Sequence, residues 1–293
     1  MSRPGILVTG ANGQLGKSLR SLQSGFPAFE FNFLTKEDLP IQDARLVNEY
    51  FKEHRPAFCI NAAAYTAVDK AETDKETAFS VNRDAVGNLA MSGKMYGTKL
   101  LHVSTDYVFD GTSSDPYKET SAVKPLSTYG ESKLQGEQIA VENDPSSIII
   151  RTAWVYSEHG NNFVKTMIRL MKEKKEINVV SDQVGAPTYA GDLAAVIFDI
   201  VTRSYTSSQT WVPGIYHYSN KGRISWYDFA STIKDLTGST CQVNPIPTTQ
   251  YPTPAKRPSF SLLNTDKISK TFNINIPEWK DSLQVCLEHL KSQ

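Results

Sequence analysis

The sequence predicts an α/β protein: a Rossmann-type, doubly wound parallel sheet joined to a smaller C-terminal α+β lobe. Short apolar, β-branched runs alternate with amphipathic segments through the first half of the chain. The first apolar run leads directly into the glycine-rich turn Gly10–Gly16. After residue 155 the alternation loosens, which is typical of a second, mixed unit.

The first half contains five expected strands and four expected helices. Apolar runs predict buried strands over residues 5–9, 29–34, 58–61, 100–104 and 147–152. Helical periodicity predicts helices over residues 17–23, 44–54, 74–97 and 126–142. Ligands of such sheets bind beyond the carboxyl ends of the strands. The residues just after Thr9, Asn61, Val103 and Arg151 should therefore meet at one cleft.

The second half is less regular. Helices are expected over 163–175 and 192–203, and strands within 178–186 and over 214–219, whereas the proline-rich stretch 243–258 should be mostly extended. The segments 192–203 and 214–219 could return to the main sheet. We therefore expect one unit from residues 1–154 and 190–219, and a second from 155–189 and 220–293.

Composition excludes several classes of protein. Lys plus Arg and Asp plus Glu both number 31, so no basic excess points to nucleic acid or to an anionic membrane. No apolar run reaches the roughly 18 residues of a membrane span, and the N-terminal residues do not resemble a signal peptide. Cys59, Cys241 and Cys286 lie far apart, which favours free buried thiols in a reducing cytoplasm. No histidine spacing suggests a metal site.

The glycine-rich turn indicates dinucleotide binding. Gly10 permits the tight turn out of the strand, Gly13 lets the backbone approach a pyrophosphate, and Gly16 allows close packing of helix on strand. The amides that open the following helix then face the anion. A flexible surface turn is the alternative, but the position between a strand and a helix favours the dinucleotide. The first unit is then the dinucleotide-binding domain.

The end of the second strand bears on the choice of dinucleotide. An acidic residue there would hold the ribose hydroxyl of NAD, whereas this chain has Thr35 and Lys36. A cation can accept the 2′-phosphate, so the sequence favours NADPH, with NADH possible. The alternative is that the Lys36 side chain is solvated and binds no ligand.

Tyr129 and Lys133 form the candidate catalytic pair. At i and i+4 they project from one face of a helix. A nearby ammonium is expected to lower the pKa of the phenol, which can then protonate a carbonyl oxygen as hydride arrives. Thr105, at the end of the fourth strand, should reach the same cleft and bind the carbonyl. An ordinary surface pair is the alternative. Against it, the glycine turn, the Thr105 hydroxyl and the Tyr129–Lys133 pair occur along the chain in the order that this chemistry requires, and the three together seldom arise by chance.

With these features the chain resembles the dTDP-4-dehydrorhamnose reductase (RmlD/RfbD) family of the extended short-chain dehydrogenases/reductases. The most specific matching segments are STDYVFDG and the region from GNNF to GAPT. The resemblance implies NADPH-dependent reduction of the C4 keto group of dTDP-4-dehydro-β-L-rhamnose, and it makes the second unit a substrate-binding lobe. It implies Tyr129 as proton donor, tuned by Lys133, with Thr105 orienting the keto oxygen.

The resemblance also implies binding residues. The substrate contacts would be Thr105, Asp106 and Trp154, although Trp154 could equally pack the lobe. The cofactor contacts would be Gly10, Asn12, Gly13, Gln14, Leu15, Thr35, Lys36, Ile41, Ala63, Ala64, Tyr65, Thr66, Val103, Tyr129 and Lys133. Arg257 could meet a diphosphate through its guanidinium or form a surface ion pair.

Two departures limit the resemblance. Where family members often read LDITD, this chain reads Leu39-Pro40-Ile41-Gln42-Asp43, so the backbone near Ile41 would replace an acidic contact. The stretch Tyr189–Asp192 lacks the glutamate associated with magnesium at a dimer contact in some relatives, so we expect no metal and leave monomer or homodimer open. A nucleotide-sugar epimerase, or a regulatory subunit resembling the methionine adenosyltransferase β subunit, remains an alternative function.

Overall fold

The computed structural model describes residues 3–292 and contains one six-stranded, fully parallel sheet. Its strand order is β10-β5-β4-β3-β1-β2, with the order reversing between β1 and β3. The strands are β1 (Gly5–Thr9), β2 (Glu30–Leu34), β3 (Phe58–Asn61), β4 (Lys99–Thr105), β5 (Ile148–Thr152) and β10 (Gly214–Tyr218). This confirms the predicted doubly wound α/β class, and the return of residues 214–218 to the main sheet.

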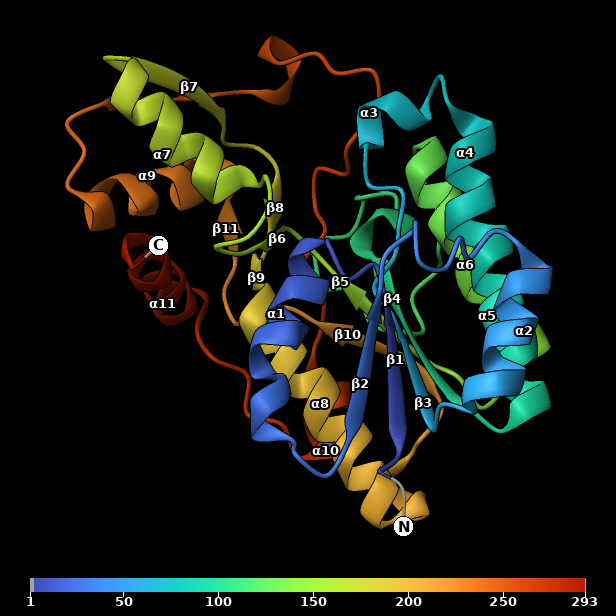
Figure 1. The fold of residues 1–293 in the computed structure, drawn as a ribbon. Coiled ribbons are helices and arrows are strands. Elements are labelled where there is room, and N and C mark those ends of the chain that lie inside the picture. The colour runs from blue at the N-terminus through green and yellow to red at the C-terminus, as the bar shows by residue number, and fades with distance from the viewer. Residues whose placement is uncertain (1–2, 293) are drawn as a thin grey trace.

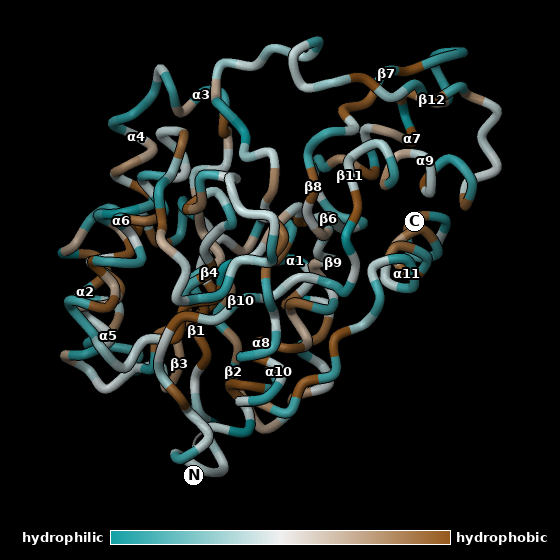
Figure 2. Tube along the Cα trace, turned by 180° about the vertical axis from the view of Figure 1, so that it is seen from behind, coloured by the Kyte–Doolittle hydropathy of each residue, from teal (hydrophilic) through white to brown (hydrophobic). Residues whose placement is uncertain are grey.

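Helices cover both faces of the sheet (Figure 1). One layer contains α2 (Ala44–His54), α4 (Lys75–Phe79), α5 (Ala85–Tyr96) and α6 (Thr128–Asn143). The other contains α1 (Gln14–Leu22), α8 (Ala190–Thr206) and α10 (Asp266–Phe272). Figure 2 shows hydrophobic residues running along the central strands between these layers. The pattern follows from burial of parallel strands on both faces.

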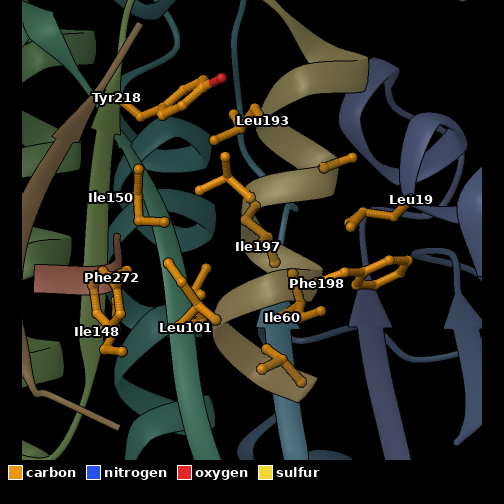
Figure 3. Close-up of a cluster of buried hydrophobic side chains, with 14 of the residues drawn as sticks. Leu19, Ile60, Leu101, Ile148, Ile150, Leu193, Ile197, Phe198, Tyr218 and Phe272 are labelled. Carbon is orange, nitrogen blue, oxygen red and sulfur yellow. The ribbon is translucent and has the colours of Figure 1, made fainter. Parts of the chain in front are cut away.

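The main core lies between the sheet and α8 (Figure 3). Ile60, Leu101, Ile148 and Ile150 project from neighbouring strands toward Ile197 and the other apolar residues of α8. All five of these side chains are fully buried. Each buried aliphatic side chain contributes roughly 1.5–3 kcal/mol relative to an exposed one, so this contact fixes α8 on the sheet.

The second unit holds three small sheets. β7 (Glu176–Val180) pairs with β12 (Gln242–Ile246), β8 (Val184–Gly185) with β11 (Ile224–Ser225), and β6 (Val155–Tyr156) with β9 (Thr188–Tyr189). The helices α7 (Phe163–Glu173), α9 (Trp226–Thr237) and α11 (Trp279–Lys291) pack with them around a separate core. Residues 266–276, which we expected in this lobe, instead carry side chains that pack into the main core, among them Ile268 and Phe272.

The expected helix over 74–97 is interrupted. A π-helical turn, Ser80–Asp84, separates α4 from α5. A Cβ on Gly136 of α6 would collide with the carbonyl oxygen of Asn82 in this turn. The two backbones thus approach too closely for any side chain, and the turn places Asn82 against α6. Periodicity alone could not show this, because a π-turn keeps the helical direction.

Short elements complete the chain. They are α3 (Val68–Ala71) and the 3₁₀ turns Gln23–Gly25, Asp106–Val108, Ser208–Thr210 and Thr248–Gln250. Among the described residues, no helix is both long and apolar enough to cross a bilayer.

Candidate active site

The glycine turn packs closely against neighbouring backbone and leaves the amides of the next helix free. Gly10 has a φ of 71°, and a Cβ there would lie 2.6 Å from the backbone of Ala62 and Ala63. A Cβ on Gly16 would collide with the carbonyl oxygen of Gly10. Gly13 caps α1 in extended conformation and no side chain bonds the cap, so the amides of the first turn point outward unpaired by side chains. These features fit a pyrophosphate.

The loop after β3 is held by two asparagines. The backbone N–H of Ala63 donates to Asn61 Oδ1 at 3.1 Å, and that of Tyr65 donates to Asn82 Oδ1 at 2.9 Å. Asn82 Nδ2 donates in turn to the Ser132 hydroxyl of α6. The loop 62–66, where the sequence places Ala63, Ala64, Tyr65 and Thr66, is therefore fixed beside both the glycine turn and α6. Thr9 Oγ1 also donates to Asn61 Oδ1 at 2.7 Å, so the ends of β1 and β3 meet as predicted.

Thr105, Tyr129 and Lys133 lie on the same side of the sheet. Thr105 ends β4, while Tyr129 and Lys133 stand one turn apart on α6, whose N-cap is Ser127. Tyr129 is 9% exposed and Lys133 1% exposed, so this is a buried pair rather than a surface one. Lys133 Nζ donates to the carbonyl of Val103 at 2.7 Å. The structure thus brings Val103 and the three expected catalytic residues together.

The pKa of Tyr129 moves opposite to the expectation. Burial raises the pKa of Tyr129 to about 12. The Thr105 hydroxyl lowers this pKa, and the charge of Asp106 raises it further. Lys133 contributes no shift to Tyr129, and its Nζ instead donates to the carbonyl of Val103. Burial lowers the pKa of Lys133 itself to about 8, while Glu137 raises it. Tyr129 is therefore a protonated phenol at neutral pH, ready to donate.

Asp106 is a buried carboxyl beside Thr105. Its side chain is 2% exposed, Oδ1 accepts from the Thr105 hydroxyl at 3.1 Å, and Oδ2 has no well-aligned hydrogen-bond partner among the described residues. Burial raises the pKa of Asp106 from 3.8 to about 6, opposed by the hydroxyls of Ser261 and Thr105. A buried, incompletely paired acceptor beside a candidate catalytic group is suited to binding a polar ligand.

We expect Asp106→Asn to stabilise the fold in a pH-dependent way. The folded protein binds the extra proton more tightly than the unfolded chain, so this group costs stability as pH rises from 3.8 through about 6. The amide should therefore gain about 3 kcal/mol near pH 7 and less than about 1 kcal/mol near pH 4. Urea unfolding at both values measures this. The matched control is Asp110→Asn, which loses the Thr112 contacts that lower the pKa of Asp110 and should gain no stability. An equal gain at both pH values would contradict the expectation.

Trp154 has a strained backbone and a stacked ring. Its φ of 49° is unfavourable for a bulky side chain, and strain of this kind concentrates at functional sites. The ring stacks on Trp226 of α9 with centroids 3.7 Å apart and 13° between planes. Gly185 leaves room for it, since a Cβ there would lie 3.0 Å from the indole. Trp154 therefore connects the main sheet to the lobe. Its position is compatible both with packing the lobe and with contacting a ligand.

Two cavities lie beside this region, each of about 730 Å³. Both are lined by Gln183, Tyr251, Thr253 and Arg257. Arg257 forms a paired ion contact with Asp69 at 2.8 and 3.0 Å, so the alternative of an ion pair is confirmed. Its guanidinium still lines both cavities, so a negatively charged ligand could also reach it.

The other expected cofactor residues lie on the opposite side of the glycine turn. The Lys36 side chain is 86% exposed and stands 3.7 Å from Glu37. Thr35 is tied by its backbone N–H and its hydroxyl to Asp38. The carbonyl of Ile41 already accepts from Asn88 at 3.0 Å. Lys36 is exposed enough to meet a phosphate, which would compete with the Glu37 carboxylate for it.

Sequence reasoning missed several residues that build the site. Ser157 and Asn162, which were not predicted, both donate to Oε1 of the expected cofactor residue Gln14 and tie the glycine turn to the lobe. Glu137 and Arg151 form a fully buried ion pair beneath Lys133, with N and O 2.6 Å apart. Glu137 could have been found, because it repeats the i, i+4 spacing of Tyr129 and Lys133.

Among the residues that the structure describes, no three His, Cys, Asp or Glu side chains lie close enough together to bind one metal ion. Asp192, in the stretch 189–192, accepts hydrogen bonds from Asn220 and Ser282 instead.

Known proteins are similar to this chain in sequence and in architecture. A family model described as the RmlD substrate binding domain matches residues 4–292. A dTDP-4-dehydrorhamnose reductase of Aggregatibacter actinomycetemcomitans is 43% identical over 285 residues, which cover 95% of this chain and 97% of that protein.

Two solved structures agree with it in fold. A dTDP-4-dehydrorhamnose reductase from Clostridium acetobutylicum has a TM-score of 0.93 and 41% identity, covering 98% of this chain and 99% of that one. The enzyme of the same name from Bacillus anthracis, solved in complex with NADP, has a TM-score of 0.93 and 36% identity, covering 98% and 100%.

Proposed function

Because the chain belongs to the dTDP-4-dehydrorhamnose reductase family, we propose that it reduces the C4 keto group of dTDP-4-dehydro-β-L-rhamnose to give dTDP-L-rhamnose, with NADPH as the preferred reductant. It is an oxidoreductase of nucleotide-sugar metabolism. The observation that carries the proposal is the buried set of Thr105, Tyr129 and Lys133 at the strand ends, beside the glycine turn.

The cofactor fits the glycine turn and the exposed cation after β2. The backbone amides that open α1 would meet the pyrophosphate, and the Asn61- and Asn82-anchored loop would flank the nicotinamide. Gly10 and Gly16 let the protein's own backbone pack closely around this turn. Lys36 would meet a 2′-phosphate, which supports NADPH over NADH. When bound, the reduced nicotinamide supplies the hydride.

The protein's own groups supply the proton and the orientation. The Thr105 hydroxyl would hold the keto oxygen while Tyr129, a protonated phenol at neutral pH, gives its proton to that oxygen. As hydride adds to the carbonyl carbon and the C=O π bond breaks, the keto oxygen would take the phenolic proton and stay on C4 as a hydroxyl group. Tyr129 then regains a proton that derives from solvent. Asp106 and Trp154 would bind the sugar.

The nucleotide part of the substrate would occupy the cavities of the lobe. Arg257 lines both cavities and carries a fixed positive charge suited to a diphosphate. We accordingly propose residues 1–154 with 190–219 as the dinucleotide-binding domain and 155–189 with 220–293 as the substrate lobe, apart from the segment 266–276 that packs into the main core. The free buried cysteines fit a cytoplasmic location.

Turnover on a panel of nucleotide sugars tests the proposal. With dTDP-4-dehydrorhamnose the absorbance of NADPH should fall, and it should fall more slowly with NADH. Oxidised cofactor that stays bound, with no net consumption of NADPH, would indicate an epimerase. Binding of NADPH without turnover of any keto sugar would indicate a regulatory subunit. Either result would overturn the proposed reaction.

A further inference from the structure

His102 lies behind Lys133, on the side away from the cleft. It stands on β4 and is fully buried, directly beside Asn61 in the register of β3 and β4. Its Nε2 is 3.3 Å from Lys133 Nζ, and its Nδ1 is 3.0 Å from Asn61 Nδ2. No step proposed above uses this imidazole, yet it contacts one of the candidate catalytic groups.

The orientation of the Asn61 amide is fixed by its other partners. Asn61 Oδ1 accepts from the backbone N–H of Ala63 at 3.1 Å and from the Thr9 hydroxyl at 2.7 Å. A flipped amide would place its NH₂ group against the N–H of Ala63, a contact between two donors. Asn61 Nδ2 therefore donates to His102, and Nδ1 of His102 must be the acceptor.

The tautomer of His102 follows from this. Burial and the charge of Lys133 hold the pKa of His102 well below its ordinary value, so the ring is neutral. A neutral imidazole that accepts at Nδ1 carries its hydrogen on Nε2. The Nε2–H then faces Lys133 Nζ. An amine has a lone pair that can accept this hydrogen, whereas an ammonium has none.

We propose that His102 is a positioning residue for Lys133: its Nε2–H donates to Nζ and favours the neutral amine of Lys133 over the ammonium. The carbonyl of Val103, at 2.7 Å from Nζ, accepts from the amine at the same time. A protonated Lys133 loses the contact with His102 and faces its Nε2–H as a second donor, so protonation favours movement of Nζ away from His102 while its bond to the Val103 carbonyl strengthens. Proton uptake and the position of Nζ are thereby coupled.

Other titratable groups near the pair act differently. Glu137, one turn further along α6, raises the pKa of Lys133 but is itself paired with Arg151 of β5. Tyr129 of α6 and Asp106 beyond β4 have raised pKa values, Tyr129 being neutral at pH 7. The thiol of Cys59, on β3, is also kept neutral by burial, which raises its pKa. His102 is therefore the neutral donor that opposes Glu137 at Lys133.

The inference rests on the proposed function for its catalytic meaning, but its first test needs no turnover. In protein labelled with ¹⁵N-histidine, the His102 signals, identified by their loss in His102→Gln, should show a protonated Nε2 and an unprotonated Nδ1. A hydrogen on Nδ1, or on both nitrogens, would overturn the proposal whatever the enzyme's activity.

A pair of substitutions then tests the effect on Lys133. Asn at position 102 keeps an acceptor near Nδ1 and loses the donor at Nε2, whereas Gln supplies a donor near Nε2. NMR titration of ¹³C-lysine should show the pKa of Lys133 rising by about half a unit or more in His102→Asn and much less in His102→Gln. The matched control is His217→Asn, because His217 is equally buried and is likewise kept neutral, with its pKa lowered to about 3.

The same variants give a kinetic readout. If the reductase activity is established, the limb of the pH profile of kcat/KM that follows Lys133 should move to higher pH in His102→Asn and stay in place in His217→Asn. An unchanged Lys133 titration in His102→Asn would overturn the proposal. Absence of reductase activity together with the predicted tautomer and titration would instead overturn the proposed function alone.

Discussion

Replacing Tyr129 by phenylalanine should reduce kcat by about 10²- to 10⁴-fold, the usual contribution of a positioned general acid. The ring of Tyr129 packs edge-on against Tyr107 at 5.4 Å between centroids, and phenylalanine keeps that contact. The change therefore removes the proton donor while preserving the fold. Steady-state assays of NADPH consumption measure the effect, and fluorescence titration with NADPH should show nearly unchanged binding.

The matched control is Tyr107→Phe, which deletes a neighbouring buried hydroxyl. Burial raises the pKa of Tyr107 above its ordinary range, so it too is a neutral phenol, but it follows Asp106 in a 3₁₀ turn and not in α6. We expect its kcat to stay within a few-fold of the parent. Equal losses in both variants would show that the hydroxyl of Tyr129 has no special part in the reaction.

The second large effect concerns the ion pair beneath the site. Arg151 and Glu137 are 3% and 2% exposed at their side chains, and Ser104 donates to the same carboxylate. Arg151→Met fills the space of the aliphatic part of the arginine side chain and leaves the Glu137 carboxylate buried without its counter-charge. Such a change should cost about 3–5 kcal/mol in the free energy of unfolding. Urea denaturation measures it.

The double variant Arg151→Met with Glu137→Leu separates charge from packing. Removal of both partners leaves no uncompensated charge, so most of the lost stability should return. The coupling energy from the four-variant cycle should be well above the measurement error. A double variant as unstable as the sum of the two single changes would show that the loss came from packing alone.

Most of the sheet could be predicted from sequence because parallel strands buried on both faces leave unbroken apolar runs. The strands at 5–9 and 58–61 and the helix at 44–54 match the structure residue for residue. The start of α1 was expected three residues too late, because the glycines that open it lower its local helical character. The π-turn at 80–84 was missed because it depends on the contact between Asn82 and Gly136, which are distant in sequence.

The candidate site was predicted where spacing alone places groups together. Tyr129 and Lys133 could be paired because a helix brings i and i+4 to one face. The direction of the pKa shift of Tyr129 could not be predicted, since it depends mainly on burial, which residue spacing does not show. His102 gave no signal in sequence either, because its role depends on the amide of Asn61 in a neighbouring strand.

Transfer of hydride to the sugar is the central claim, and isotopic labelling tests it most directly. NADPH deuterated at the transferable position of nicotinamide C4 is incubated with dTDP-4-dehydrorhamnose in ordinary water, and the product is examined by NMR and mass spectrometry. We expect one deuterium, bound to C4 of the product sugar, for each NADPH consumed. A product without deuterium at C4, or with deuterium at another carbon, would contradict this account.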